Sequence, residues 1–384
     1  MPFTALQREL DERSTQGLRR RRRVQDSPAG VRIKTGDLEL LSFCSNDYLG
    51  LANDARLVAA LHSGLKQWGV GAGASHLVSG HLTPHHELES ALAEFVGKPE
   101  ALLFSTGYLA NLGAVQALVG RGDAVFADKL NHASLNDAMR LSRAEIQRYR
   151  HNDVEHLASL LTRSTSKRKL VITDAVFSMD GDLARLPELL TLCEQHDAWL
   201  LVDDAHGFGV LGDEGRGALS HFGLVSPRLI YMATLGKAVG VSGAFVAAEP
   251  VVIDTLVNQA RSYIYTTASL PAISVAVLES LNLMRSEGWR RGHLQQLMAQ
   301  LRVGCADLPW QLMASGTPIQ PLLIGDNQSA VELSEGLRAQ GILVPAIRPP
   351  TVPQGTARLR ISLSAAHTGT DVNQLIEALH ELAH

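Results

Sequence analysis

AWLLVDDAHGFG, residues 198–209, is the stretch of this sequence that says most about the fold. An apolar run typical of a buried strand leads into two acids and a histidine, Asp203, Asp204 and His206. In open parallel sheets the ligand crevice lies beyond the carboxyl ends of the strands, so residues placed there face a ligand rather than the core. A solvated turn is the alternative interpretation, but it leaves His206 without a role.

Six more strand candidates accompany this one. From about residue 100 to 250, short apolar runs alternate with helical patterns, which indicates repeated βα units and a mostly parallel sheet. The other predicted strands are 101–105, 123–128, 145–150, 169–177, 229–234 and 243–249, with helices between them such as Val154–Arg163 and Pro187–His196. We therefore expect an α/β protein with a mostly parallel, seven-stranded sheet between helices.

The pattern changes after residue 250 to longer helices and fewer strands, which predicts a second, smaller α/β domain. Helices are expected at Pro271–Arg285, at Arg290–Leu301 and from Ala330, and strands at 320–325, 341–347 and 357–364. The first fifty residues read as an amphipathic helix, an arginine run and a short strand, which is too little to fold alone. The predicted division is an N-terminal arm at 1–50, a large domain at 51–275 and a small domain at 276–384.

Composition excludes several classes of protein. A net charge of −4 argues against a nucleic-acid-binding protein, which needs a basic excess. The three cysteines are far apart, without the spacing of a disulfide framework or a zinc site. The N-terminus has no apolar signal region, its acids do not suit a transit peptide, and no apolar run is long enough to span a bilayer. A cytoplasmic enzyme acting on small molecules is expected.

Lys237 is the candidate nucleophile. It lies in ATLGKAVGVSGA, residues 233–244, just beyond a predicted strand and among small or apolar neighbours. A desolvated ammonium has a lowered pKa and its amine is a better nucleophile, whereas a lone lysine is ordinarily a surface charge. A phosphate-binding Walker A motif does not fit, because Tyr231 stands where that motif needs glycine and Ala238 where it needs Ser or Thr.

Two further stretches place polar groups beside predicted strand ends. In FSTGYLANLG, residues 104–113, Gly107 and Tyr108 open a predicted helix whose backbone N–H groups suit a phosphate, although an ordinary N-cap is the competing interpretation. In ADKLNHASLNDA, His132 follows a strand and is placed to stack on a planar ring, or it is a satisfied structural histidine.

Two other patterns were weighed and set aside. Gly207, Gly209 and Gly212 match G-x-G-x-x-G, but a dinucleotide site also needs an acid on the next strand, and LIYMAT has none. His81, His85 and His86 suggest metal, but they lack the HExxH spacing and Pro84 interrupts them. No metal site is predicted.

Taken together, seven motifs resemble the α-oxoamine synthases, which are fold-type-I enzymes dependent on pyridoxal 5'-phosphate (PLP). The motifs are SNDYLGL (45–51), FSTGY (104–108), NHASL (131–135), HND (151–153), VFSMDGD (176–182), VDDAHGFGVLG (202–212) and TLGKAVGVSG (234–243). The resemblance covers nearly the whole chain in the family's order. It implies a fold-type-I transferase with PLP as cofactor.

The resemblance also implies roles around the cofactor. Lys237 would form the Schiff base with PLP and carry the substrate's proton, and Asp203 would pair with the pyridine nitrogen. The other implied cofactor contacts are His206 and Ser178 at the phenolic oxygen, His132 on the ring face, and Gly107, Tyr108 and Thr234. Thr266 or Thr267 resembles a residue that reaches the phosphate from a second subunit, which implies a homodimer.

Members of this family join an amino acid to an acyl thioester with loss of carbon dioxide. Residues 346–367 are similar to the biotin-biosynthetic branch, which uses L-alanine and a pimeloyl thioester; a glycine C-acyltransferase is the alternative. The resemblance does not separate pimeloyl-CoA from pimeloyl-acyl carrier protein. It assigns Arg360 to the amino-acid carboxylate, Thr351 to substrate, and Arg20, or Arg19 in another register, to the acyl donor.

Overall fold

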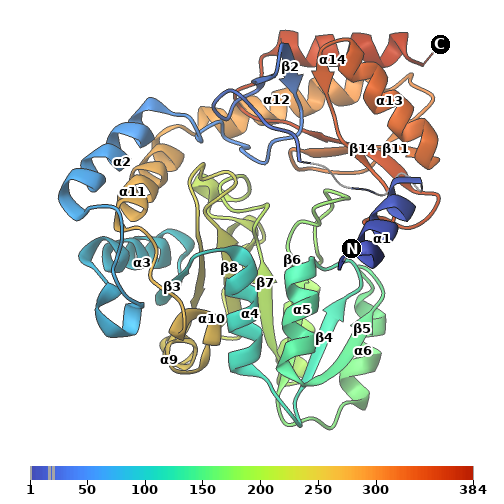
Figure 1. The fold of residues 1–384 in the computed structure, drawn as a ribbon. Coiled ribbons are helices and arrows are strands. Elements are labelled where there is room, and N and C mark those ends of the chain that lie inside the picture. Colours follow the sequence, from blue (N-terminus) through green and yellow to red (C-terminus); the bar gives the residue numbers. More distant parts are fainter. Residues whose placement is uncertain (1, 16–18, 20–21, 384) are drawn as a thin grey trace.

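The structure is a computed structural model that describes residues 2–15, 19 and 22–383. Its lower part in Figure 1 is built around one large sheet, and its upper part contains the smaller sheets with the C-terminal helices. None of the helices in the described residues is both long and apolar enough to cross a membrane.

The large sheet has seven strands in the order β3-β9-β8-β7-β6-β4-β5. Their bounds are β3 Glu100–Phe104, β4 Ala124–Asp128, β5 Glu145–Tyr149, β6 Lys169–Asp174, β7 Trp199–Asp203, β8 Leu229–Thr234 and β9 Ala244–Ala248. All neighbouring pairs are parallel except those made by β9, which runs antiparallel to both β8 and β3. The predicted α/β class, the seven strands and the mostly parallel pairing are confirmed.

Alternation along the central strands produces two separate cores. On β6, Val171 packs into one hydrophobic cluster, whereas Leu170 and Ile172 pack into the other. The first cluster is covered by α3 (Thr83–Val96), α6 (Val154–Arg163) and α7 (Leu186–Gln195), and the second by α4 (Gly107–Leu118), α5 (Ala133–Ser142), α9 (Pro250–Gln259) and α10 (Arg261–Ile264). The sheet is thus buried on both faces, as parallel sheets are.

Asp153 explains why α6 begins where the apolar periodicity predicted it. Its side chain caps the helix by accepting the N–H of His156 at 2.8 Å. The predicted helix Pro187–His196 is displaced by one residue to Leu186–Gln195, with Pro187 in its first turn. Short helices at Asp213–Gly215 (η2) and α8, Ala218–His221, complete the connection between β7 and β8.

The C-terminal part contains a four-stranded sheet in the order β10-β11-β14-β13. Its strands are β10 Gln311–Leu312, β11 Ile319–Gly325, β13 Ala346–Ile347 and β14 Ala357–Ser362, and its helices are α12 Trp289–Gly304, α13 Asn327–Ala339 and α14 Gly369–Glu381. The helix predicted from Ala330 begins three residues earlier because Asp326 caps it, accepting the N–H of Ser329 at 2.8 Å. The rest of the predicted pattern, apart from residues 341–347, matches with shifts at the ends.

Residues 341–347 do not form the single strand that was predicted. They form two short strands, β12 (Ile342–Leu343) and β13, which belong to different sheets. Pro345 lies between them, and since it has no backbone N–H it cannot continue a ladder. Its carbonyl instead accepts the N–H of Arg360 at 3.0 Å.

The N-terminal region packs against the C-terminal part. β1 (Arg32–Thr35) and β2 (Leu38–Ser42) form a hairpin where one short strand was predicted, and β12 adds to β2 in parallel. Arg32 also pairs with Asp371 of α14 at 2.7 Å. The predicted first helix exists as α1, Thr4–Thr15, but it has no buried residue.

The predicted domain limits stay a prediction, because α11 (Pro271–Ser286) runs across the proposed division at residue 275. This helix lies beside α2 (Ala55–Trp68), as Figure 1 shows. Gly64 makes the close approach possible, because a Cβ there would lie 2.9 Å from the Cα of Ala272. A five-residue π-helix, His76–Gly80, and α3 follow α2 along the chain.

Candidate active site

Four adjacent strands of the large sheet end in polar residues at the same edge. β8 ends at Thr234, β7 at Asp203, β6 at Asp174 and β4 at Asp128. A cavity of about 190 Å³ lies at this edge. Its lining is Gly107, Tyr108, His132, Ser134, Asp174, Ser178, Asp203, Ala205, His206, Met232, Thr234 and Lys237. The structure therefore brings together eight of the predicted site residues at the place where parallel sheets bind ligands.

Lys237 and His206 are in direct contact in this cavity. Nζ of Lys237 lies 2.8 Å from Nε2 of His206. Burial lowers the pKa of Lys237 to about 8, although the charge of Asp203 opposes the shift. The pKa of His206 falls well below its usual value because the ring is buried and Lys237 lies beside it. At neutral pH the histidine is a neutral imidazole, and a fraction of the lysine is a free amine.

Asp203 and Asp204 point to different environments, as successive strand-end residues do. Asp203 lines the cavity and accepts hydrogen bonds from Asn111 Nδ2 at 2.7 Å and from the N–H of Ala205 at 3.0 Å. Asp204 is fully buried and accepts from Tyr231 Oη at 2.7 Å and from the N–H of Ala218 at 2.6 Å. Burial raises the pKa of Asp204 to about 7. Through its two hydrogen bonds, Asp204 connects the end of β7 to β8 and to the start of α8 beneath the site.

Gly207, the first of the glycines that match G-x-G-x-x-G, packs against this buried acid. A Cβ on Gly207 would lie 2.1 Å from Oδ1 of Asp204, so no larger residue fits there. The segment continues as turns into the short 3-10 helix Asp213–Gly215, and no α-helix opens at the glycines. The geometry required for a dinucleotide-binding turn is absent from these described residues.

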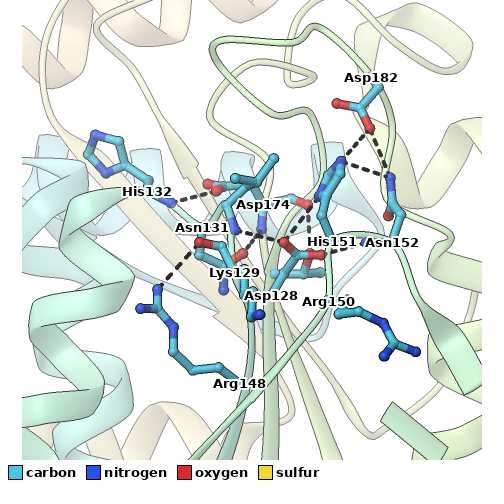
Figure 2. A network of polar contacts seen from close by, with 12 residues as sticks. Asp128, Lys129, Asn131, His132, Arg148, Arg150, His151, Asn152, Asp174 and Asp182 are labelled. Atoms are coloured by element: carbon cyan, nitrogen blue, oxygen red, sulfur yellow. Dashed lines mark hydrogen bonds and ion pairs between the residues drawn. The ribbon is translucent and has the colours of Figure 1, made fainter. Parts of the chain in front are cut away.

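His132 caps α5 at the edge of the cavity. Its backbone N–H donates to Oδ2 of Asp174 at 2.7 Å (Figure 2). Its ring Nδ1 lies 2.8 Å from the hydroxyl of Ser134. Burial lowers the pKa of His132, against the charge of Asp203. For Asp174 the shift has the opposite direction, because burial and the charge of Asp203 both raise the pKa of Asp174 well above its usual value.

The start of α4 supplies the backbone groups expected at a phosphate site. Thr106 caps the helix by accepting the N–H of Leu109 at 3.2 Å, and Gly107 and Tyr108 line the cavity. The first four N–H groups of an α-helix have no intrahelical acceptor, and the helix dipole favours an anion beside them. Thr234 lies nearby, and its hydroxyl donates to the carbonyl of Gly243 at 3.1 Å.

Arg360 lies behind Ser178 rather than in the cavity lining. Its Nε donates to the carbonyl of Ser178 at 2.6 Å, while its terminal nitrogens reach Ser362 Oγ at 2.7 Å and Asn46 Oδ1 at 3.2 Å. The side chain is buried, at 5% exposure, and three of its five N–H donors are used in these bonds. The remaining donors are available to a carboxylate.

Five predicted or alternative residues lie elsewhere or outside the described chain. Thr351 is exposed on the loop between β13 and β14, and neither Thr266 nor Thr267 lines the cavity. Arg20 lies outside the described residues, and the alternative Arg19 lies 3.8 Å from Asp11. The sequence predictions for these positions stay predictions.

The histidine cluster at residues 76–86 lies away from this cavity. His85 uses both ring nitrogens on the backbone, accepting from the N–H of Leu82 at 3.1 Å and reaching the carbonyl of Ser269 at 2.9 Å. The ligand atoms of His81, His86 and Glu89 lie within 4.8 Å of one another. The absence of a metal site stays a prediction.

Four cavity residues or partners were missed in the sequence. Asn111 lies in the segment FSTGYLANLG, and Ser134 lies in the motif NHASL. Asn111 is four residues beyond Gly107, so helical spacing alone places Asn111 and Gly107 on one face of their helix. Tyr48, in SNDYLGL, lies 2.6 Å through its hydroxyl from Nδ1 of His206. Asp174 is the last residue of β6, and the end of that strand was the signal that could have found it.

The chain is similar to named enzymes over nearly its full length. The family model described as aminotransferase class I and II matches residues 39–379. The 8-amino-7-oxononanoate synthase of Nitrosospira multiformis is 61% identical over 97% of this chain and 94% of its own, and that of Methylobacillus flagellatus is 58% identical over 98% and 96%.

Solved structures agree with the sequence relatives. Serine palmitoyltransferase of Sphingomonas wittichii superimposes with a TM-score of 0.93 and 32% identity, over 99% of this chain and 97% of its own. A structure of SPT with its PLP internal aldimine gives 0.93 at 29% identity and the same coverage. The 8-amino-7-oxononanoate synthase of Francisella tularensis gives 0.77 at 32% identity, over 89% of this chain and 97% of its own.

Proposed function

The chain belongs to the class I and II aminotransferase family, and we infer that it catalyses the 8-amino-7-oxononanoate synthase reaction of biotin biosynthesis. In that reaction L-alanine and a pimeloyl thioester condense with loss of carbon dioxide, and PLP is the cofactor. The observation that carries the inference is the contact between Lys237 and His206 beside Asp203, in a chain 55–61% identical to enzymes of that name over nearly its full length. The activity is that of a PLP-dependent acyltransferase.

The residues around the cavity suit PLP in charge and type. Lys237 offers the amine, Asp203 a carboxylate for the pyridine nitrogen, and the start of α4 the N–H groups for the phosphate. Hydroxyls of Ser178 and Thr234 and the rings of His132 and His206 complete the set. We propose that these residues hold the cofactor.

When bound, PLP withdraws electrons from the amino-acid Cα and thereby makes its proton removable. Lys237 is the base placed to take that proton and to return one to the product, because its lowered pKa leaves part of it as a free amine near neutral pH. Asp203, fixed by Asn111, would present its carboxylate to the pyridine nitrogen. His206 orients the lysine amine through the 2.8 Å contact.

Arg360 is proposed to bind the carboxylate of L-alanine. It is held in place through Ser178 and Asn46, and a guanidinium can bind a carboxylate with two parallel hydrogen bonds. Arg20 is proposed as an acyl-donor contact and Thr351 as a substrate contact, both on the strength of the resemblance. The donor is pimeloyl-CoA or pimeloyl-acyl carrier protein, which present the same thioester.

The working unit is proposed to be a cytoplasmic homodimer in which Thr266 or Thr267 reaches the partner's phosphate site. In support, neither threonine lines the cavity of its own chain. Several large apolar side chains are also exposed. Tyr265, next to these threonines, is 71% exposed, and Val70 and Val78, which flank the start of the π-helix, are 85% and 79% exposed. Exposed apolar groups of this size are typical of an interface.

An assay of thiol release separates this function from its alternative, a glycine C-acyltransferase. The PLP-loaded protein is given L-alanine, glycine or L-serine with pimeloyl-CoA, pimeloyl-acyl carrier protein or acetyl-CoA. The highest kcat/KM is expected for L-alanine with a pimeloyl donor. A higher value for glycine with acetyl-CoA would overturn the substrate assignment while leaving the family unchanged.

A further inference from the structure

His151 connects two loops that border the cavity. His151 itself does not line the cavity. The first loop, Asp128–His132, follows β4 and ends at the proposed ring-stacking residue. The second, Val176–Leu183, follows β6 and carries Ser178. The HND motif at 151–153 is not among the residues that line the cavity.

Both ring nitrogens of His151 face a carboxylate (Figure 2). Nδ1 lies 3.1 Å from Oδ1 of Asp128, and Nε2 lies 2.9 Å from Oδ2 of Asp182. An ionised carboxylate only accepts hydrogen bonds, so both nitrogens must donate and the ring is a cation. Burial lowers the pKa of His151, but its hydrogen bonds to the two carboxylates outweigh this and raise the pKa to about 10.

The first contact fixes the Asp128–His132 loop. Asp128 is buried, at 1% exposure, and its carboxylate also accepts the N–H of Leu130 at 2.8 Å and that of Asn152 at 2.9 Å. Because these bonds share one carboxylate with His151, the start of the loop and the HND segment are held as one unit. His132 follows at the end of that loop.

The second contact fixes the Val176–Leu183 loop. Nδ2 of Asn152 donates to the same Asp182 oxygen as His151, at 2.9 Å, and to the carbonyl of Leu183 at 3.1 Å. The His151 ring also packs edge-on against Phe177, with 4.4 Å between ring centroids and 89° between planes. Phe177 directly precedes Ser178, so the histidine contacts the loop on both sides of that serine.

From the C-terminal part, β14 holds the same loop independently. Arg358 pairs with Asp180, and Arg360 bonds the carbonyl of Ser178. Loss of His151 would therefore leave the Ser178 loop attached through β14. Its link to the loop of His132 would be reduced to the bonds of Asn152 with Asp128, Asp182 and Leu183.

We propose that His151 is a positioning residue that ties these two loops together and so sets His132 and Ser178 relative to each other in the cavity. This role rests on the proposed function for its catalytic consequence. The link between the loops is a property of the protein without PLP, so the two can fail separately.

Asp182 offers the sharpest pair of variants. Asp182→Ala removes the oxygen to which His151 donates, whereas Asp182→Asn keeps an amide oxygen there. Asp182→Ala should raise the Kd for PLP and lower kcat at saturating PLP by about ten-fold each, because small displacements of site residues are costly. Asp182→Asn should restore most of both. Asp197→Ala, which removes a surface ion pair with Arg228, is the control expected to stay within about two-fold of the parent.

Hydrogen exchange on the protein without PLP tests the link directly. Asp182→Ala should speed exchange of the Leu130 amide, which lies in the other loop and keeps its own bond to Asp128. His151→Gln should do the same, and His156→Gln, whose ring accepts the N–H of Arg150 in the same connection, should not.

Three outcomes decide the proposal. Faster Leu130 exchange in Asp182→Ala, with weakened PLP binding rescued by Asp182→Asn, supports it. A double variant of His151→Gln and Asp182→Ala should lose less than the sum of the two single variants, since both remove the contact between His151 and Asp182. Parent-like Leu130 exchange in Asp182→Ala overturns the link even if His151→Gln fails to fold. Faster exchange with unchanged PLP affinity and kcat overturns the positioning role and leaves the proposed function intact.

Discussion

The hydroxyl of Tyr48 lies 2.6 Å from Nδ1 of His206, the ring whose other nitrogen contacts Lys237. A neutral imidazole carries one N–H, so the two contacts are coupled. When Lys237 is an ammonium it donates to Nε2, and Nδ1 then donates to Tyr48. When Lys237 is a free amine, Nε2 can donate to it and Tyr48 donates to Nδ1. Tyr48 thus serves both protonation states of the lysine.

Tyr48→Phe should remove this adaptability. The variant leaves Nδ1 of the buried His206 without a partner, which costs about 1–3 kcal/mol of unfolding free energy. We expect kcat to fall about ten-fold, since the lysine amine is less well oriented. Urea unfolding and steady-state kinetics measure the two effects. Asp197→Ala, at the surface ion pair with Arg228, is the control, and equal effects from both variants would contradict the assigned contact.

The rate at which the protein captures added PLP should depend on pH through Lys237. The nucleophile is the free amine, and burial lowers its pKa to about 8. Because deprotonation activates it, the capture rate should rise with pH, with a midpoint near 8, and then level off. Stopped-flow absorbance between pH 6.5 and 10 measures this dependence. A rate that keeps rising to pH 10, as for an ordinary lysine, would contradict the desolvated environment.

Asp203→Asn should reduce catalysis without dismantling the site. The amide keeps the size of the side chain and can still accept one hydrogen bond, but it lacks the negative charge proposed to pair with the pyridine nitrogen. A loss of about 10²-fold in kcat is expected, with PLP still bound. Kinetics at saturating PLP, with absorbance to confirm loading, test it. A fully active Asp203→Asn protein would exclude the proposed role.

Arg360→Lys should affect the amino acid more than the acyl donor. Lysine keeps the charge but loses the planar fork, and a hydrogen bond to a charged group is worth about 1.5–3 kcal/mol. The KM for L-alanine should therefore rise about ten- to a hundred-fold, while the KM for the pimeloyl donor changes little. The opposite pattern, with only the pimeloyl KM raised, would move Arg360 to the other substrate.

Much of the fold could be predicted because the apolar periodicity of the large sheet is strong. All seven strands were predicted from apolar runs such as AWLLVDDA, in which residues 200–204 are all buried, and α6 was predicted from its helical periodicity. The short strands β12 and β13 could not be predicted as separate, since two residues carry no periodicity. The partner of β12 is β2, which lies near the other end of the sequence, whereas β13 pairs with β14.

The site was predictable where a residue follows a strand end in a motif, as Asp203, His206 and Lys237 do. Tyr48 could not be found in this way, because it reaches His206 from a loop 158 residues earlier. His151 lies in a motif, but its role could not be predicted, since its two acid partners are separated from it by 23 and 31 residues. Contacts of this kind depend on tertiary folding and leave no local pattern.

The most direct test is to identify the lysine to which PLP becomes attached. The protein is saturated with PLP, reduced with borohydride to make the linkage permanent, digested and mapped by mass spectrometry. We predict one pyridoxyl group per chain, on Lys237, and a colourless Lys237→Ala protein beside a yellow parent. A label on another lysine, or a parent that binds no PLP, would contradict the central claim.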